Sequence, residues 1–320
     1  MTNNFGETTT ADEAASFYAN EIKGKIVLIT GCTWGGLGAE AARAIAKHDP
    51  KLLILAGRKQ EALDDTVQKI KEESPEANLR TLIIDLASLE SVKKAAAEVN
   101  QYSEPIDVLI NNSGIMATPY HTTIDGFEGQ FGTNHLGPFV FTNLILPRIL
   151  ASSSRRIVNV SSGLSSLSDI RFDDPFFKNG ETYYKWLAYG QSKTANILFA
   201  RELAKRYGSK GLVAFSLHPG VIQTNLFRDV KPEEMQGPYY DAWGQELDMS
   251  LVDFKNLAQG ASTHIVAAFD LSIKNNSGSY LSSCKIAEDH PWLKPYAKND
   301  EDAKKLWALS EQLVAQQFSL

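Results

Sequence analysis

Seven short apolar runs, separated by longer segments, constrain the fold of this chain more than any other feature. Most of these runs are continuously apolar, which is typical of parallel strands covered on both faces. Segments with helical character lie between them, such as Glu61–Glu73, Leu89–Gln101 and Ser192–Tyr207. The alternation predicts a doubly wound α/β sheet of about seven parallel strands, with helices on both faces. The predicted strands are Lys25–Thr30, Lys51–Gly57, Leu79–Leu86, Ile106–Asn112, Arg155–Ser162, Leu212–Pro219 and Gly278–Ser283.

Length and composition indicate one domain over 1–320, because no repeat, low-complexity tract or linker divides the 320 residues. A net charge of −6 gives no sign of a nucleic-acid partner. Only two cysteines occur, without metal-binding spacing, so no metal is expected. The first twenty residues resemble neither a signal nor a transit peptide, and no apolar run could span a membrane. We therefore expect a cytoplasmic protein.

Four segments lie outside this alternation. Residues 1–23 form an N-terminal extension, and 300–320 form an amphipathic helix that is expected to pack on its own domain. Residues 163–188 and 223–255 follow the fifth and sixth predicted strands. Ligands of open α/β sheets bind at the carboxyl ends of strands, so these two are predicted substrate loops. The acidic 223–255 segment is a candidate lid.

A glycine-rich turn follows the first predicted strand, where Thr30 and Gly31 are followed by Gly36 and Gly38. Such a turn at a helix start presents backbone N–H groups to a pyrophosphate. The usual T-G-x-x-x-G-x-G spacing is exceeded by one residue, which we expect to bulge within Cys32–Gly35. The alternative is a βα turn without a ligand. The strand before it and the small-residue helix after it favour a dinucleotide cradle.

The end of the second predicted strand bears on which dinucleotide binds. NAD sites usually place an acid there for the ribose hydroxyl, whereas this strand ends in Gly57, Arg58 and Lys59. A guanidinium can hold a 2′-phosphate through paired hydrogen bonds. The residues favour NADP(H), although a solvated Arg-Lys turn is a common alternative.

Tyr189 and Lys193 lie four residues apart, on one face of a predicted helix. A nearby ammonium stabilises a phenolate and lowers the pKa of the phenol. The pair alone is weak evidence, because this spacing usually marks a solvated helix face. Other polar residues strengthen it: Ser161 and Ser162 end the fifth strand, and Asn134 precedes an apolar helix.

Taken together, these motifs resemble those of the short-chain dehydrogenases/reductases, from about Gly24 to Ser283. The resemblance is greatest to the branch with retinol dehydrogenases and protochlorophyllide reductases, through "NHLGPF", "QSKTANILFARELAKR" and "HPGVIQTNL". The matching elements are Thr30-Gly31, Gly36-x-Gly38, Asp85-Leu86, Asn111-Asn112-Ser113-Gly114, Asn134, Ser162, Tyr189-x-x-x-Lys193 and Pro219-Gly220 with Thr224.

The resemblance implies a role for each matching residue. Tyr189 would donate or accept the proton, and Ser162 would hold the substrate oxygen. Lys193 would bind the nicotinamide ribose and lower the Tyr189 pKa, and Asn134 would anchor a water in a proton relay. The positions expected to bind the cofactor are Gly31, Gly36, Leu37, Gly38, Arg58, Lys59, Asp85, Leu86, Asn112, Tyr189, Lys193, Pro219, Gly220, Ile222 and Thr224.

Two departures from the family pattern stand out. Ser113 replaces the usual alanine of Asn-Ala-Gly, and the connection from Ser162 to Tyr189 is longer than in compact members. Relatives often pair through the helix that carries the catalytic tyrosine, so a homodimer is possible unless the long loops block it.

The predicted activity is hydride transfer between NADPH and the ketone or aldehyde group of a bulky aromatic or alicyclic molecule, in secondary metabolism. Reduction of a conjugated C=C bond and NADP(H) sensing without turnover are the alternatives. The intact Ser162, Tyr189 and Lys193 set argues against a sensor. Aromatic residues of the two loops are candidates for the pocket wall or for ordinary loop cores: Phe172, Phe176, Phe177, Tyr183, Tyr184, Trp186, Tyr239, Tyr240 and Trp243.

Overall fold

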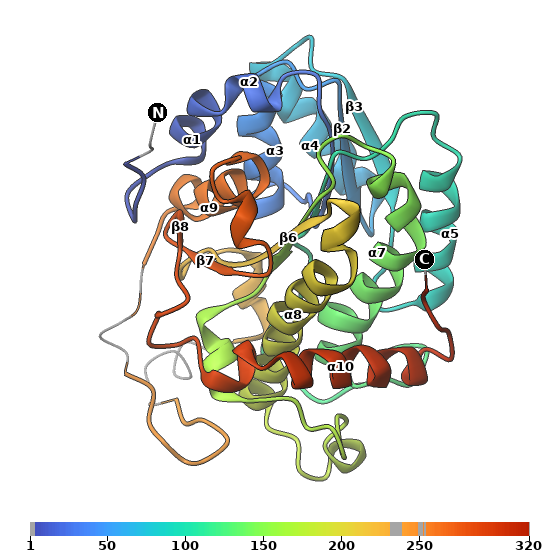
Figure 1. Cartoon of the computed structure of the whole chain (residues 1–320), viewed down its shortest axis with the longest axis vertical. Helices are drawn as coiled ribbons and strands as arrows, with labels where there is room; N and C mark the ends of the chain where they lie inside the picture. The colour runs from blue at the N-terminus through green and yellow to red at the C-terminus, as the bar shows by residue number, and fades with distance from the viewer. Residues whose placement is uncertain (1–3, 231–238, 249–251, 253, 320) are drawn as a thin grey trace.

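One twisted sheet forms the centre of the structure, a computed structural model that describes residues 4–230, 239–248, 252 and 254–319 (Figure 1). Its strand order is β3-β2-β1-β4-β5-β6-β7-β8, with β1 to β7 parallel and β8 antiparallel. The predicted fold and all seven predicted strands are confirmed, whereas β8 was too short to predict. The strands are β1 (Ile26–Thr30), β2 (Leu52–Gly57), β3 (Leu79–Ile83), β4 (Val108–Asn111), β5 (Arg156–Val160), β6 (Val213–His218), β7 (Tyr280–Ser282) and β8 (Lys285–Ile286).

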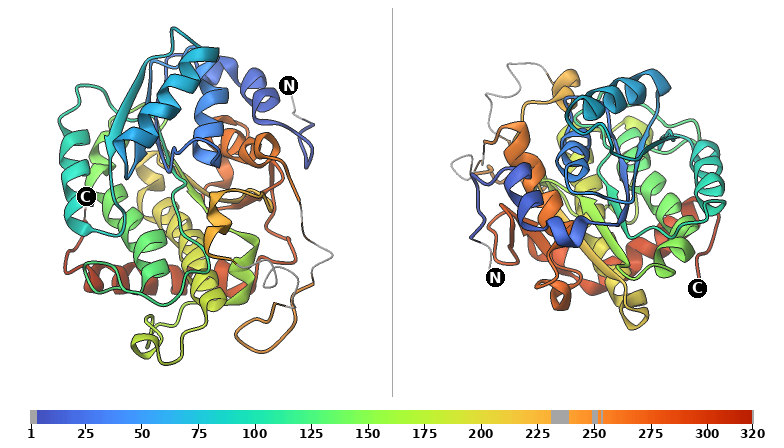
Figure 2. Two further views of the ribbon diagram at one scale, coloured as in Figure 1. Left: turned by 180° about the vertical axis from the view of Figure 1, so that it is seen from behind. Right: turned by 90° about the horizontal axis from the view of Figure 1, so that it is seen from above.

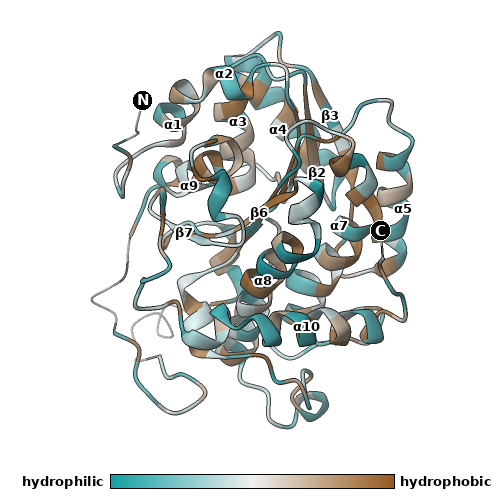
Figure 3. Cartoon of the chain, in the orientation of Figure 1, coloured by the Kyte–Doolittle hydropathy of each residue, from teal (hydrophilic) through white to brown (hydrophobic). Residues whose placement is uncertain are grey.

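Helices cover both faces of the sheet, as two separate apolar cores show (Figure 2). Alternate strand residues point to opposite faces, so Leu28 belongs to one core and Ile29 to the other. Hydrophobic residues gather along the strands in Figure 3. One face carries α1 (Ala11–Phe17), α3 (Leu37–Ala46), α4 (Gln60–Glu73) and α9 (Leu257–Phe269). The other carries α5 (Leu89–Asn100), α7 (Gly137–Leu150), α8 (Lys185–Tyr207) and α10 (Asp300–Leu313).

The carboxyl edge of the sheet has a point where the chain order reverses. β1 lies between β2 and β4, so the connections after β1 and β4 leave in opposite directions. A crevice between such diverging connections is where doubly wound sheets bind ligands. The glycine turn after β1 and Asn112 after β4 both lie at this point.

The N-terminal extension is folded onto the domain. Short helix α2 (Ala19–Ile22) follows α1, and α1 packs against α9 and α3. Asp12 of α1 forms a 2.6 Å ion pair with Arg43 of α3, which also contacts Glu40 and Glu73. The polar sequence of this extension concealed its apolar face, which consists of small alanines: Ala11, Ala14 and Ala15 are buried.

Helix α10 lies across α8 in Figure 1 and covers part of its outer face. Trp307 of α10 is buried against Phe139 of α7, with ring centroids 5.0 Å apart, and the Arg206 guanidinium lies 4.2 Å from the Trp307 ring. The predicted C-terminal helix is confirmed, but it ends at Leu313 rather than at 320. Because α10 occupies this surface, a homodimer through α8 would have to use its remaining exposed positions. Pairing stays a prediction.

Within the described part of the chain, every helix is too short or too polar to pass through a bilayer.

Helix α8 begins at Lys185, seven residues before the predicted start at Ser192, so Tyr189 and Lys193 both lie inside it. Part of the candidate lid, residues 231–238, 249–251 and 253, lies outside the described residues.

Candidate active site and cofactor cleft

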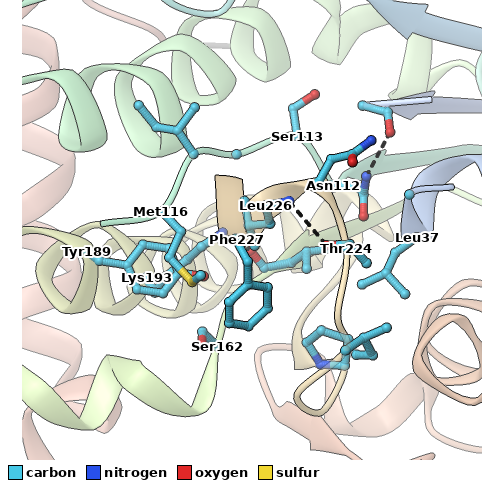
Figure 4. Close-up of a pocket in the computed structure, with 18 of the residues that line it drawn as sticks. Leu37, Asn112, Ser113, Met116, Ser162, Tyr189, Lys193, Thr224, Leu226 and Phe227 are labelled. Atoms are coloured by element: carbon cyan, nitrogen blue, oxygen red, sulfur yellow. Dashed lines mark hydrogen bonds between the residues drawn. The ribbon is translucent and has the colours of Figure 1, made fainter. Parts of the chain in front are cut away.

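A single long cleft follows the carboxyl edge of the sheet, from the glycine turn to the loops after β5 and β6 (Figure 4). Most of the predicted site residues line it: Gly31, Gly36, Leu37, Arg58, Asp85, Leu86, Asn112, Ser162, Tyr189, Lys193, Pro219, Gly220, Ile222 and Thr224. Gly38, Lys59 and Asn134 lie near the cleft without lining it. Side chains predicted to bind a dinucleotide and to move a proton therefore share one cavity.

The glycine turn takes up its additional residue in a tight turn over Thr33–Gly36, closed by a 3.0 Å bond from the Gly36 N–H to the Thr33 carbonyl. Gly35 has a φ of 80°, which is strained for residues with a side chain. Thr33, within this turn, lines the cleft. Gly36 ends the turn as the N-cap of α3, so the first N–H groups of that helix lie at the cleft.

Close packing behind the turn requires the last glycine. A Cβ on Gly38 would lie 2.7 Å from the Gly31 carbonyl oxygen and 2.6 Å from the Asn112 amide nitrogen. Thr30 also ties the ends of β1 and β4 together, because its hydroxyl accepts bonds from the Asn112 and Ser113 N–H groups at 3.0 and 3.1 Å. The residues present fit a dinucleotide pyrophosphate: a fixed backbone cradle at the start of a helix.

The end of the cleft beside β2 and β3, where the adenosine is predicted to lie, combines a cation with a carboxylate. Arg58 is exposed at the rim directly after β2, whereas Lys59 is the N-cap of α4. Asp85 accepts a 3.0 Å bond from the Ala87 N–H, and its own N–H donates to Ser91 at 2.9 Å. The Asp85 carboxylate is therefore held in place at the cleft wall.

Tyr189 and Lys193 lie one turn apart on α8, and both are buried (Figure 4). The Lys193 Nζ lies 5.7 Å from the centroid of the Tyr189 ring and donates a 3.1 Å bond to the Val160 carbonyl. Burial lowers the pKa of Lys193 to about 8, so the ammonium form still predominates at neutral pH. Ser161 fixes this part of the helix, because its hydroxyl donates to the Lys193 carbonyl at 2.7 Å.

The Tyr189 phenol has an environment that sequence reasoning did not foresee. Burial raises the pKa of Tyr189 above its ordinary value, and a hydrogen bond with Ser162 lowers it in part. The expectation that Lys193 lowers the Tyr189 pKa is therefore wrong here, because the lowering comes from Ser162 and burial outweighs it. In this protein-only environment the phenol keeps its proton at neutral pH, which is the form that donates to a substrate oxygen.

Asn134 lies in a π-helical turn, Gly132–Leu136, that precedes α7. Its amide accepts a 2.8 Å bond from the Ile115 N–H and donates to the Ile115 carbonyl and to Ser192 of α8. Such π-bulges occur frequently at functional sites. Asn134 links the loop after β4 to α8, while its role in a proton relay stays a prediction.

The substrate end of the cleft is apolar, but most of the loop aromatics do not form it. Trp186 and Tyr239 line the cleft, with ring centroids 5.0 Å apart. Phe172 and Phe176 pack on the sheet core, Phe177 is buried against Tyr183, and the remaining aromatics are exposed: Tyr184, Tyr240 and Trp243. The loop-core alternative is correct for the four packed residues, whereas the three exposed ones fit neither expectation.

Several lining residues were not predicted. Phe227 and Phe254 belong to the second substrate loop, and Met116 of the loop after β4 lines the cleft while also packing in an apolar cluster. Trp292 comes from a segment after β8 and packs over Gly163, where a Cβ would lie 2.2 Å from its ring. No local motif marks Trp292, because its contacts with Gly163 and His218 join parts of the chain that are far apart in sequence.

Comparison with known proteins defines the class of this cleft. The short chain dehydrogenase family profile matches residues 25–173. The human protein named Retinol dehydrogenase 14 is 38% identical over 303 residues, 91% of this chain and 86% of that protein. Short-chain dehydrogenase/reductase prx1 of Penicillium roqueforti is 37% identical over 306 residues, 92% and 86% of the two chains.

Solved structures agree with this assignment. A crystal structure of an uncharacterized protein from Mycobacterium paratuberculosis has a TM-score of 0.71 and 33% identity, covering 93% of this chain and 96% of that one. NADPH-bound carbonyl reductase from chicken fatty liver shares the fold, with a TM-score of 0.59 and 22% identity over 82% of this chain and 98% of that one. The chain belongs to the short-chain dehydrogenase/reductase family, within its retinol dehydrogenase-like branch. It is an oxidoreductase that acts on alcohol or carbonyl substrates.

Proposed function

We propose that this protein reduces the ketone or aldehyde group of a bulky apolar molecule with NADPH. The observation that carries the proposal is the shared cleft, in which Ser162, Tyr189 and Lys193 lie on the same sheet edge as the glycine turn. The hydride comes from the dinucleotide. The chain itself has to bind the carbonyl, orient it and supply one proton.

The preference for NADPH rests on Arg58. Arg58 is exposed and lines the cleft directly after β2, Thr33 is an exposed lining residue of the glycine turn, and no acid ends β2. A 2′-phosphate would gain a charge-assisted hydrogen bond there, whereas an unphosphorylated ribose would not. Because NADPH is the usual reducing dinucleotide, carbonyl reduction is the proposed direction.

The proton is supplied by Tyr189. Its phenol is protonated at neutral pH, since burial raises its pKa, and it shares a hydrogen bond with Ser162. Both hydroxyls would donate to the carbonyl oxygen, and the phenol proton would pass to that oxygen as the alcohol forms. The Lys193 ammonium would then stabilise the phenolate left behind. In this order of events, Lys193 stabilises the Tyr189 phenolate after the proton has been transferred, rather than lowering the pKa of the phenol beforehand.

The substrate class follows from the walls beside Tyr189. The apolar side chains of Met116, Trp186, Leu226, Phe227 and Tyr239 line this end of the cleft. Apolar walls around a few polar groups are typical of sites for bulky organic ligands. The names of the relatives, retinol dehydrogenases, agree with a substrate of this kind.

The direct test is NADPH oxidation by the purified protein with aromatic, alicyclic and linear aliphatic ketones and aldehydes. We expect turnover to be greatest with the bulky carbonyls, and Tyr189→Phe to reduce it about a thousandfold while NADPH binding is retained. Turnover that survives Tyr189→Phe would contradict the proposal. So would NADPH binding without reduction of any carbonyl, which is the behaviour of a sensor.

The dinucleotide preference has its own test in Arg58→Met. We expect the wild-type protein to bind NADPH more tightly than NADH in a fluorescence titration, because only NADPH carries the 2′-phosphate. Arg58→Met should weaken NADPH binding about tenfold and leave NADH unchanged. Lys71→Met is the matched control, since Lys71 is exposed near the end of α4 and does not line the cleft. Tighter binding of NADH by the wild-type protein would refute the assignment.

A further inference from the structure

Helix α9 lies along the dinucleotide end of the cleft without lining it. One face of this helix packs behind two residues that do line the cleft, Leu37 and Ile222. Gly260 and His264 are four residues apart and therefore lie on the same face of this helix. A Cβ on Gly260 would lie 2.6 Å from the Ile222 side chain and 2.9 Å from Leu37. Ile222 and Leu37 both line the cleft, so α9 packs directly behind them.

His264 supports the third wall residue, Asn112. The Asn112 Nδ2 donates to the carbonyls of Thr30 and Gly31, at 2.9 and 3.3 Å. The opposite amide orientation would place Oδ1 against these two carbonyl oxygens, so Oδ1 faces the His264 Nε2, 3.2 Å away. Since Oδ1 can only accept, Nε2 must carry the hydrogen. Burial lowers the pKa of His264 to about 4, although the Gly260 backbone offsets part of this effect, so the imidazole is neutral with a single N–H. Among the described residues Nδ1 has no hydrogen-bond partner of good geometry, which agrees with that N–H being on Nε2.

Other contacts fix the position of α9 itself. Its residues Gly260 to Phe269 are all buried, and α1 and α3 pack against it. On a different side, the Ser262 hydroxyl lies 3.0 Å from the Cys284 Sγ, and Thr263 accepts a 3.2 Å bond from the Cys284 N–H. The helix is therefore held from several directions, which a supporting element requires.

We propose that α9 is a brace for the dinucleotide site, in which His264 and Gly260 are positioning residues. His264 fixes Asn112, and thereby the carbonyls of the glycine turn, while Gly260 allows Leu37 and Ile222 to keep their places at the cleft. Neither residue touches the reacting atoms. The inference rests on the proposed dinucleotide binding, but it does not depend on the substrate or on NADPH rather than NADH.

Two substitutions at His264 isolate the hydrogen bond. His264→Gln keeps an N–H donor of similar reach, whereas His264→Met fills the space without a donor. We expect His264→Met to weaken binding of the preferred dinucleotide five- to tenfold, which is the typical effect of losing one hydrogen bond. His264→Gln should keep most of the wild-type affinity, because it keeps the donor. kcat at saturating dinucleotide should change less than twofold, because Tyr189 and Lys193 lie on α8.

Gly260→Ala tests the packing contact independently. The new methyl group would push Ile222 and Leu37 toward the cleft, so the dinucleotide Kd should rise about threefold with kcat unchanged. Ser262→Ala is the matched control: it also removes a hydrogen-bonding group from α9, but from the side that faces Cys284. We expect this control to lower the melting temperature without changing the Kd.

Three outcomes would overturn the brace. The first is a dinucleotide Kd that stays unchanged in both His264→Met and Gly260→Ala. The second is an equal loss of dinucleotide affinity in His264→Gln and His264→Met. The third is a Kd change in Ser262→Ala as large as that in His264→Met, which would show that the weaker binding comes from a general loss of helix stability. Failure of the wild-type protein to bind either dinucleotide would instead refute the proposed function. If His264→Met does not fold, His264→Gln and Gly260→Ala still decide the matter.

Discussion

The two ends of the cleft are built in different ways. At the dinucleotide end the glycine turn after β1 and the start of the loop after β4, which the Thr30 hydroxyl joins, contribute backbone to the walls, beside side chains such as Leu37 and Asp85. At the substrate end the walls are side chains, and they come from the loops after β4, β5 and β6 and from the segment after β8. The first end depends on a few short distances that any side chain would disturb. The second depends on the shapes of large residues that other residues could replace.

This difference separates binding of the dinucleotide from choice of the substrate. A substitution behind the glycine turn has to move carbonyl groups, so its effect spreads along β1 and α3. A substitution among the aromatic walls alters one surface and leaves the strands in place. Substrate choice can thus vary while the dinucleotide site is kept. Tyr189 and Lys193 on α8 lie where the two ends meet.

Apart from Tyr189→Phe, the largest expected effect lies at this junction, in Lys193→Met. Loss of the ammonium should lower kcat about a hundredfold or more, because nothing else among the described residues of this helix turn can stabilise a phenolate at Tyr189. The same substitution should stabilise the fold, since the charged Lys193 is buried and its pKa falls to about 8. We expect a gain of about 2 kcal/mol at pH 7, after loss of the bond to Val160.

The pH dependence of stability checks the cause of that gain. Below pH 8 both the folded and the unfolded wild-type chains carry a protonated Lys193, so the full cost of burial applies. Between pH 8 and the ordinary value of 10.5 only the unfolded chain keeps the proton, and wild-type stability should rise. The difference from Lys193→Met should therefore shrink in chemical denaturation across this range. A constant difference would mean that packing, rather than charge, is responsible.

The same contrast explains how much could be predicted from the sequence. The strands and the Tyr189–Lys193 pair were predictable, because apolar runs and fixed spacings are local signals. The walls of the substrate end were not, since Trp292 meets Gly163 only through the tertiary fold. The raised Tyr189 pKa was also hidden, because burial is a property of the whole packed site. The N-terminal helix α1 escaped prediction because alanines formed its buried face.

The next largest effect is expected at the dinucleotide end of the cleft, in Gly38→Ala. The added Cβ would meet the Gly31 carbonyl oxygen at 2.7 Å, so the turn itself has to shift. We expect the dinucleotide Kd to rise about a hundredfold and the chain to lose about 2 kcal/mol of stability. Titration and denaturation measure the two effects. Gly208→Ala is the matched control, because a Cβ there meets nothing within 4 Å.

A small effect of Gly38→Ala would break the comparison directly. If dinucleotide binding fell less than threefold, the turn would be adaptable, and the two ends of the cleft would not differ in the way that their construction suggests.

The smallest effect is expected at the side-chain end, in Trp292→Ala. Trp292 is buried, lines the cleft and covers Gly163, the residue after Ser162, so its removal should widen the space beside the substrate oxygen. The KM of a bulky ketone should rise about tenfold, while the dinucleotide Kd changes less than twofold.

Trp292→Phe keeps most of the ring and should retain most of the affinity for the ketone. Trp243→Ala is the control, because Trp243 is exposed and contacts Tyr296 outside the cleft. If Trp292→Ala weakened the dinucleotide as much as the ketone, the two ends would be mechanically coupled, and the side-chain walls would help to set the backbone cradle.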